Sequence, residues 1–137
     1  MGLILDTSFL IESERRGEGI EDILRRVRTA QGEIDVAPSA ISAVELTHGI
    51  YRARSESDRI RRRAFVDGVL RDLVVHPLTL EIAKAAGQIE GEQAAQGVSI
   101  AIEDLIIGAT ALHVGFDVVT LNLRHFARIP GLNVVQL

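Results

Sequence analysis

Short apolar runs alternate with helical patterns along the first part of the chain. Residues 3–5 are apolar and stop at a carboxylate, so they predict a short strand. Thr7 and Ser8 carry hydroxyls suited to capping a helix that begins with the apolar residues 9–11. Over residues 20–27 apolar side chains recur at helical spacing, with acids early and arginines late, as the helix dipole favours. The pattern predicts a strand followed by two helices.

The same alternation continues through the middle of the chain. An alternating stretch at 34–37 meets a proline and predicts a second strand, and a serine then caps a helix over 39–51. Residues 56–73 form an amphipathic helical pattern with a run of arginines on one side. A third short strand is expected at 74–77, and a helix over 79–95 follows it.

The last part of the chain predicts a buried helix and two more strands. Residues 105–112 are apolar nearly all round, which is typical of a helix enclosed between layers. The patterns at 117–121 and 132–135 indicate strands. Strands separated by helices pair in parallel, so we expect a three-layer α/β/α sandwich with a mainly parallel central sheet, formed by a single domain over residues 1–137.

Composition narrows the possibilities without identifying a function. The 137 residues are 47% hydrophobic, enough for one substantial core. The formal charge of −4 provides no overall attraction to nucleic acid, and the absence of cysteine excludes thiolate catalysis and disulfides. The longest strongly apolar stretch, 105–116, contains a histidine and is well short of the roughly 20 residues that span a bilayer. We expect a soluble protein with no membrane contact and a cytoplasmic location.

Three carboxylates occupy positions that the fold does not require. Asp6 follows the first strand, Glu45 lies beside an apolar helical stripe, and Asp104 is at the start of the buried helix. Taken singly they also fit a helix cap, a solvated helix residue and a partner of the helix dipole. Taken together, half-buried carboxylates without a basic partner suit a hard cation, Mg²⁺ or Mn²⁺, which activates water and stabilises phosphoryl oxygens.

The three carboxylates lie in three of four sequence blocks. These four blocks resemble, in order and over nearly the whole chain, those of VapC-type PIN domains. The blocks are Leu5-Asp6-Thr7-Ser8 with Phe9-Leu10-Ile11, then Ser42 to Leu46, Glu103 to Leu112, and Thr120 to Phe126. The resemblance implies a divalent-metal-dependent endoribonuclease in which Asp6, Glu45 and Asp104 bind the metal. It also implies a structured RNA substrate, inhibition by a cognate antitoxin as in a toxin–antitoxin pair, and a homodimer.

One position departs from the pattern of many PIN domains. Asn122 occupies the place where they carry a fourth carboxylate. Its amide can still hold a water molecule or a phosphate, so we include it with Asp6, Glu45 and Asp104 as a catalytic residue. The alternative is that Asn122 is only a turn residue.

Several other polar residues are weaker candidates. Hydroxyls near the carboxylates, those of Thr7, Ser8 and Thr120, can hydrogen-bond them, although helix capping explains Thr7 and Ser8 almost as well. Glu103 is expected to be solvated, because adjacent helix residues point apart. His48 and His125 are expected in ordinary surface or packing roles, and the arginines within 59–63 are expected to form a solvated helix face. Contacts with RNA are the alternative for each of them.

Other functions compete with this interpretation. A response-regulator receiver needs an acceptor aspartate after the third strand and a late lysine, whereas the only lysine here is Lys84 in a helix. A dinucleotide-binding domain needs a glycine-rich loop after the first strand, which is absent. The remaining alternative is a catalytically weakened PIN-like module that binds RNA or protein, which the amide at Asn122 keeps open.

Overall fold

The computed structural model describes residues 1–137 and has an α/β fold around one parallel sheet. The four strands are β1 (Gly2–Leu5), β2 (Asp35–Pro38), β3 (Asp117–Val119) and β4 (Val134–Val135). They lie in the order β2-β1-β3-β4, and every neighbouring pair is parallel. The expected α/β class and the parallel sheet are confirmed.

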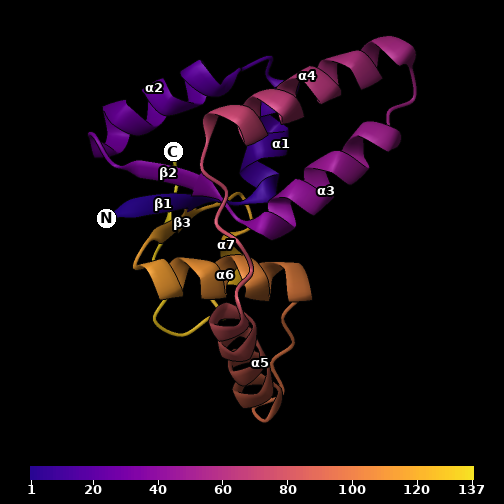
Figure 1. The fold of residues 1–137 in the computed structure, drawn as a ribbon. Coiled ribbons are helices and arrows are strands. Elements are labelled where there is room, and N and C mark those ends of the chain that lie inside the picture. Colours follow the sequence, from indigo (N-terminus) through magenta and orange to yellow (C-terminus); the bar gives the residue numbers. More distant parts are fainter.

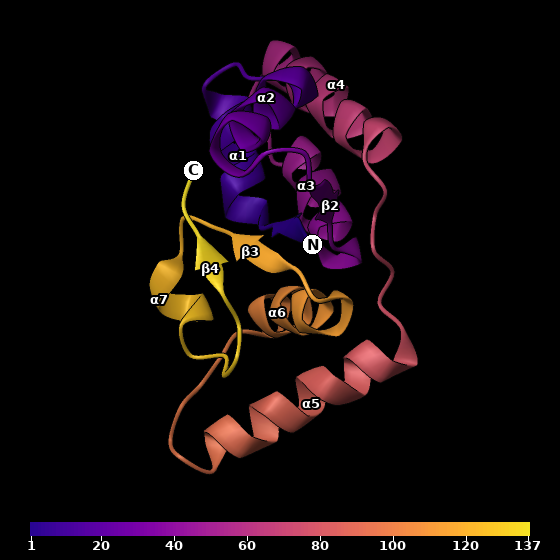
Figure 2. The same ribbon diagram turned by 90° about the vertical axis from the view of Figure 1, so that its left-hand side faces the viewer.

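Helices cover both faces of this sheet (Figure 1). Two helices link β1 to β2, four link β2 to β3, and a short one links β3 to β4. In chain order they are α1 (Thr7–Arg15), α2 (Ile20–Gln31), α3 (Ala40–Tyr51), α4 (Glu56–Asp72), α5 (Leu80–Ala94), α6 (Ile102–Val114) and α7 (Leu123–Phe126). Figure 2 shows α1 to α4 on one side of the sheet and α6 on the other, with α5 packed beneath α6.

The central strand β1 is buried on both faces, as expected of a parallel sheet. Leu3 and Leu5 join the core cluster that packs against α1 to α4, while Ile4 points to the opposite face and joins the cluster around α6. All four residues of β1 are buried. This alternation fixes the register of β1, because a one-residue slip would exchange the two sets of side chains between the layers.

Helix α6 is enclosed between the sheet and α5, which confirms the expectation drawn from its apolar circumference. Its residues 105–111 are all buried. Ile107 and Ala111 pack towards the sheet, whereas Leu105 and Ala109 pack against α5. The helix ends at Gly115, whose φ of 74° is in the left-handed region that favours glycine.

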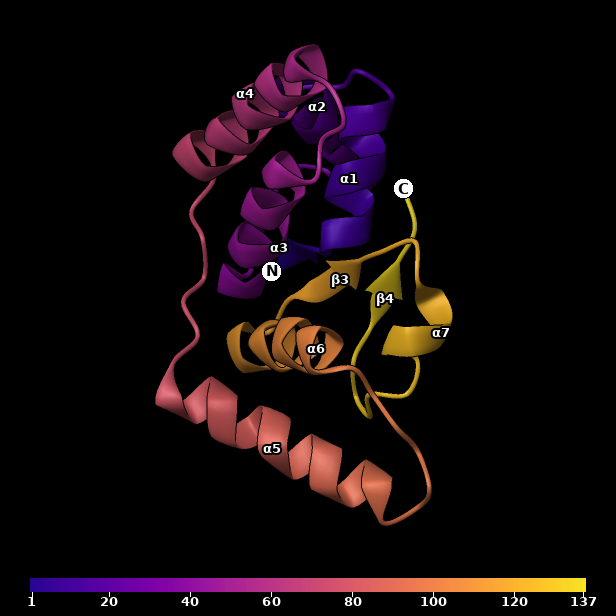
Figure 3. The ribbon, with the colours of Figure 1, turned by 90° about the vertical axis from the view of Figure 1, so that its right-hand side faces the viewer.

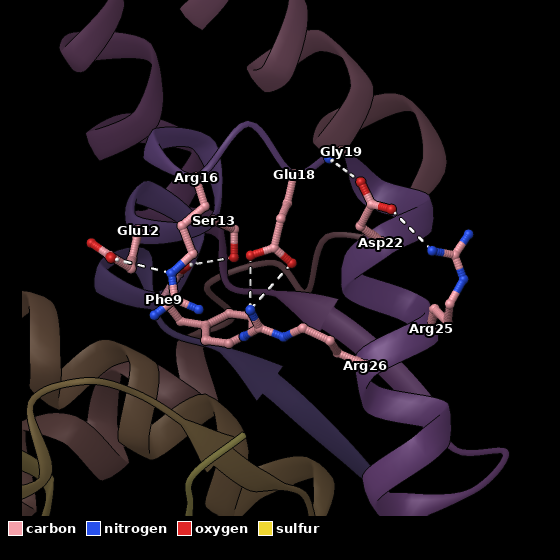
Figure 4. Close-up of polar contacts among 9 residues, drawn as sticks. All are labelled: Phe9, Glu12, Ser13, Arg16, Glu18, Gly19, Asp22, Arg25 and Arg26. Carbon is pink, nitrogen blue, oxygen red and sulfur yellow. Dashed lines mark hydrogen bonds and ion pairs between the residues drawn. The ribbon is translucent and has the colours of Figure 1, made fainter.

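On the other side of the sheet, a polar network joins α1 to α2 (Figure 4). The Arg26 guanidinium lies 4.9 Å from the centre of the Phe9 ring and donates a 2.8 Å hydrogen bond to Glu18. Asp22 accepts from the backbone N–H of Gly19 at 3.1 Å, which satisfies a free donor at the start of α2. These contacts set the position of α2 relative to α1.

The strand expected at residues 74–77 is not formed. His76 makes only an isolated parallel bridge with Ser39, and the rest of the segment is an extended connection between α4 and α5. Figure 3 shows this connection running along one side of the molecule. The apolar residues at 74 and 75 suggested a strand, but the segment passes the end of β2 instead of lying along it, so no ladder can form.

No helix combines the length and apolar character needed to span a bilayer.

Candidate active site

The candidate site lies where the strand order of the sheet reverses, between β1 and β3. The chain leaves β1 towards β2 on one side and later returns to β3 on the other side of β1. Ligands of open parallel sheets bind beyond the carboxyl ends of the strands at such a point. Asp6 directly follows β1 and Thr120 directly follows β3, and the Asp6 N–H donates a 2.9 Å hydrogen bond to the Val119 carbonyl.

Asp6 is 3% exposed and is oriented by two hydroxyl groups. Its Oδ2 accepts from Ser8 Oγ at 2.6 Å and from Thr120 Oγ1 at 2.7 Å. Both hydrogen bonds use the same oxygen. Oδ1 of Asp6 has no hydrogen-bond partner among the side chains, so this oxygen remains free for a ligand.

Glu45 is positioned by a chain of hydroxyls that connects α1 to α3. Thr7 Oγ1 donates to Glu45 Oε1 at 2.7 Å, and Ser42 Oγ lies 2.9 Å from Thr7 Oγ1. Because the Thr7 proton points to Glu45, Ser42 donates to Thr7. Thr7 and Ser42 are both buried, so their hydroxyls need these partners.

The expectation that Thr7 and Ser8 cap the first helix is therefore wrong. The N-cap position of α1 is Asp6, and no side chain makes a capping hydrogen bond there. The two hydroxyls instead hold the carboxylates of Asp6 and Glu45. Sequence reasoning ranked them below the carboxylates and did not consider Ser42, although its position one helical turn before Glu45 is a usable signal.

Asp104 lies in the first turn of α6 and contacts a histidine of the short helix α7. His125 Nδ1 is 3.2 Å from Asp104 Oδ2. Burial raises the pKa of Asp104, and the nearby Asp6 raises it further, while His125 opposes the rise. His125, expected as a surface or RNA-contacting residue, is thus a direct partner of a site carboxylate.

The carboxylates are close enough to disfavour one another's ionisation. Partial burial is the main cause of a raised pKa at Glu45, and the charges of Asp6, Glu103 and Asp104 add to it against the Thr7 hydrogen bond. Neither Arg nor Lys forms a salt bridge with Asp6, Glu45 or Asp104. The structure thus brings together the three acids that the sequence singled out, without a permanent positive charge among them.

Glu103 also belongs to this group, contrary to the expectation that it is simply solvated. It is half-buried, and its charge raises the pKa of both Glu45 and Asp104. The arginine-bearing face of α4 differs from expectation too. Arg61 pairs with Glu14 of α1 at 3.3 Å, and Arg62 donates to the Gly49 carbonyl at 2.7 Å, so these side chains join helices.

The backbone of Asn122 is hydrogen-bonded to a side chain that holds Asp6. Its N–H donates a 2.9 Å hydrogen bond to Thr120 Oγ1, the same hydroxyl that donates to Asp6. The residue is exposed and occupies the N-cap position of α7, but its side chain makes no capping hydrogen bond there. His48, by contrast, is an exposed residue of α3.

The donor set suits a hard divalent cation. All candidate ligands are carboxylate oxygens, and their mutual repulsion would be relieved by a cation. As the side chains are placed, no group of three or more acidic or histidine residues is arranged to hold a metal ion. The chemistry of the ligands therefore fits, while their convergence on one ion requires side-chain adjustment.

Residues 3–132 match the family model described as PIN domain, a span that includes every residue of the site. The chain belongs to the PIN-domain family. The resemblance seen in the four sequence blocks is thereby confirmed.

Curated relatives of this PIN-domain chain are VapC proteins. Ribonuclease VapC1 of Rickettsia felis is 32% identical over 141 residues, covering 100% of this chain and 97% of the relative. The tRNA(fMet)-specific endonuclease VapC of Salmonella typhimurium is 34% identical over 101 residues, covering 74% and 76%.

Solved structures agree with this fold. The DNA-bound VapBC complex of Salmonella typhimurium contains a chain with a TM-score of 0.83 and 29% identity, covering 99% of this chain and 98% of that one. A chain of VapBC2 of Rickettsia felis, bound to a promoter DNA fragment, has a TM-score of 0.84 at 21% identity and supports the fold alone.

Proposed function

We propose that this PIN-domain chain is an endoribonuclease that hydrolyses RNA phosphodiester bonds at the carboxyl edge of its sheet. The observation that carries the proposal is the meeting of Asp6, Glu45 and Asp104, held by hydroxyls and a histidine and free of arginine or lysine partners. The ribonuclease and endonuclease names of its relatives support the same activity. We assign it to one nuclease domain over residues 1–137.

The cofactor in this proposal is Mg²⁺ or Mn²⁺, held by Asp6, Asp104 and Glu45. When bound, the cation activates water and stabilises charge on the phosphoryl oxygens. The chain's own residues prepare the ligands for it. Ser8 and Thr120 hold Oδ2 of Asp6 and leave Oδ1 free, and Thr7 holds Oε1 of Glu45.

His125 and Asn122 have subsidiary roles in the proposed site. His125 Nδ1 fixes the orientation of Asp104 through Oδ2, as hydrogen-bonded partners commonly do for ligating carboxylates. Asn122 comes two residues after Thr120, whose hydroxyl holds Asp6. Its side-chain amide is therefore available to a phosphate or to a water molecule at the same edge of the sheet. A neutral side chain there limits the negative charge that an approaching RNA strand meets.

The biological role that we propose is that of the toxin in a toxin–antitoxin pair. The VapBC complex of Salmonella typhimurium, which contains a chain 29% identical to this one, supports a cognate antitoxin as partner. The exposed apolar side chains of Val44 (62%) and Tyr51 (66%) on α3 support association with protein, including a second copy of this chain. We propose a cytoplasmic location, in keeping with a cellular RNA substrate and such a partner.

A circular RNA tests the endonuclease activity directly. Only an internal cut can open a closed circle, so the purified chain with Mg²⁺ or Mn²⁺ should convert circular RNA into a linear product. Gel electrophoresis separates the two forms. If circular RNA stays intact while it binds to the protein, the chain is an RNA-binding module and the endonuclease proposal is wrong.

Expression in a bacterial host tests the toxin role. The intact chain should arrest growth, and co-expression of the small protein encoded directly beside it should restore growth. The Asp104→Asn variant is the matched control and should be harmless at the same expression level. Unimpaired growth with the folded wild-type chain contradicts the toxin role without affecting the nuclease proposal.

A further inference from the structure

A second feature adjoins the acidic cluster on the α3 side. It is a pocket of about 400 Å³ between α1, α3 and α4, and Glu45 forms part of its wall. Four arginines line it together with Glu14 and Glu45, and they come from three separate parts of the chain. They are Arg15, Arg52, Arg54 and Arg62, which we call the arginine pocket.

The arginines of this pocket have no acidic partners. None of the four forms a salt bridge, whereas seven other arginines of the chain do. Figure 4 shows Arg16, Arg25 and Arg26 paired in this way on α1 and α2. Even Glu14, which lines the pocket, pairs with Arg61 outside it. Four arginine residues therefore line one pocket, and none of them is neutralised by a salt bridge.

This local charge contrasts with that of the whole chain. The formal charge is −4, yet the four guanidinium groups of the pocket outnumber its two carboxylates. Like charges gathered around one hollow repel each other, and an anionic ligand removes that repulsion. Guanidinium groups form paired hydrogen bonds with phosphate oxygens and remain charged at any physiological pH.

The pocket and the acidic cluster share a wall. Glu45 accepts the Thr7 hydrogen bond that belongs to the cluster, and it also lines the arginine pocket. An RNA strand whose scissile phosphodiester lies at Asp6 and Asp104 can therefore place a neighbouring phosphate among the arginines. Continuity with the acidic cluster favours this occupant, because an RNA strand bound at the cut site carries further phosphates on either side of the scissile one.

We propose that the arginine pocket binds backbone phosphates of the RNA substrate beside the cut site. This inference rests on the proposed nuclease function and adds to it the element that positions the strand. Phosphate contacts of this kind set the register of the nucleic acid without reading its sequence. Arg52 and Arg54 carry this role, because Arg62 is also committed to the Gly49 carbonyl.

The test is a comparison of two charge-matched double variants. Arg52→Gln with Arg54→Gln removes two free guanidinium groups from the pocket. Arg25→Gln with Arg71→Gln removes the same charge from exposed salt bridges outside it, at little cost in stability. Binding of bulk transfer RNA is measured over a range of salt concentrations in excess chelator, with gels to show that the RNA stays intact.

We expect the pocket variant to bind the RNA at least about tenfold more weakly than the wild-type chain at low salt. The slope of log affinity against log salt should become shallower by roughly 0.7 to 0.9 for each phosphate that the variant no longer binds. The control variant should retain the slope of the wild-type chain. If the double pocket variant fails to fold, Arg54→Gln alone should show about half of the slope change.

Three outcomes overturn the inference. Wild-type protein that does not bind RNA at low salt lacks a phosphate site that acts on its own. Equal loss in the pocket and control variants shows that only total charge matters. Tight binding of a poly-glutamate peptide that depends on Arg52 and Arg54, with RNA binding unchanged, identifies a protein-docking pocket. In the last two cases circular RNA can still be cut, so the proposed function survives the failure.

Discussion

At the scale of single residues, hydroxyl groups determine how the acidic side chains are presented. Asp6 depends on Ser8 from its own turn and on Thr120 from beyond β3, and Glu45 depends on Thr7. Thr120 has the most connected position, because its hydroxyl donates to Asp6 and accepts from the N–H of Asn122. This single side chain joins the ends of β1 and β3.

We predict that Thr120→Val destabilises the protein by about 1–3 kcal/mol, because it leaves the Asn122 N–H without its partner and removes one of the two hydrogen bonds to Oδ2 of Asp6. Thr110→Val is the matched control, since Thr110 is equally buried but bonds only to a carbonyl of its own helix. Chemical denaturation of both variants measures the difference. Equal losses would show that the site hydroxyl contributes nothing beyond a buried threonine.

Glu45 should make the metal-free protein less stable as the pH rises. Its pKa is raised in the folded state, mainly by burial, so the folded chain holds that proton more tightly than the unfolded chain does. The resulting stabilisation is complete below the ordinary carboxyl pKa of 4.5 and is lost as the pH rises through the raised value. Neutral pH is therefore the unfavourable condition for Glu45 in the absence of a cation.

We predict that Glu45→Gln raises the melting temperature in chelator at pH 7, and that this gain shrinks towards zero below pH 4. Because Glu45 is only half-buried, the effect is held below about 1 kcal/mol, or no more than about 4 °C. Melting curves across this pH range provide the measurement. A gain that is largest at acid pH contradicts the proposed crowding of carboxylates.

Asn122→Asp tests the residue that departs from the family pattern. An added carboxylate at the same edge supplies a hard anionic ligand at nearly constant volume, so the variant should tighten or create a second divalent-ion site. Calorimetric titration with Mn²⁺ measures stoichiometry and affinity for both proteins. If the substitution changes neither, Asn122 is no part of the metal site.

At the scale of elements, helix α6 both carries Asp104 and forms the centre of one layer. A β-carbon at Gly108 would collide with the side chain of Ile129, which is 2% exposed, and would touch Leu132 at 3.4 Å. The absence of a side chain at Gly108 thus allows the segment after α7 to pack on α6. This packing helps to keep His125 near Asp104.

We predict that Gly108→Ala costs about 1–3 kcal/mol of stability, because displacing Ile129 outweighs the better helix propensity of alanine. Gly87→Ala in α5 is the control, since a β-carbon there meets open space, and it should add up to about 1 kcal/mol. Denaturant unfolding measures the change in stability of each variant, and we expect the two changes to have opposite signs. Two stabilising substitutions would mean that Ile129 moves aside freely.

The strands and helices that the sequence predicted are those in which the local pattern and the packing agree. Leu3 to Leu5 and residues 105–111 are enclosed between two layers, so their burial could be predicted from the local apolar pattern. Residues 74–77 misled the prediction, because a strand exists only where a partner edge runs alongside, and that depends on the path of the whole chain.

At the scale of the whole molecule, the site is formed by segments that are far apart in the sequence. The sequence could single out Asp6, Glu45 and Asp104 by their unusual positions, and in the fold their charges lie close enough to raise the pKa of Glu45 and of Asp104. It could not pair His125 with Asp104 or bring Arg15 and Arg54 to the same pocket, because these arrangements depend on how the helices pack in space. Local patterns carry no such information.

The acidic cluster, in the proposed function, cuts RNA with the help of a divalent cation. The most direct measurement follows RNA cleavage by the purified chain with Mg²⁺ or Mn²⁺, in excess chelator, and by Asp104→Asn with the metal. We predict cleavage only by the wild-type chain with metal, and a rate at least about 100-fold lower for Asp104→Asn with no loss of thermal stability. Cleavage that persists in excess chelator, or an Asp104→Asn variant that stays fully active, contradicts this claim.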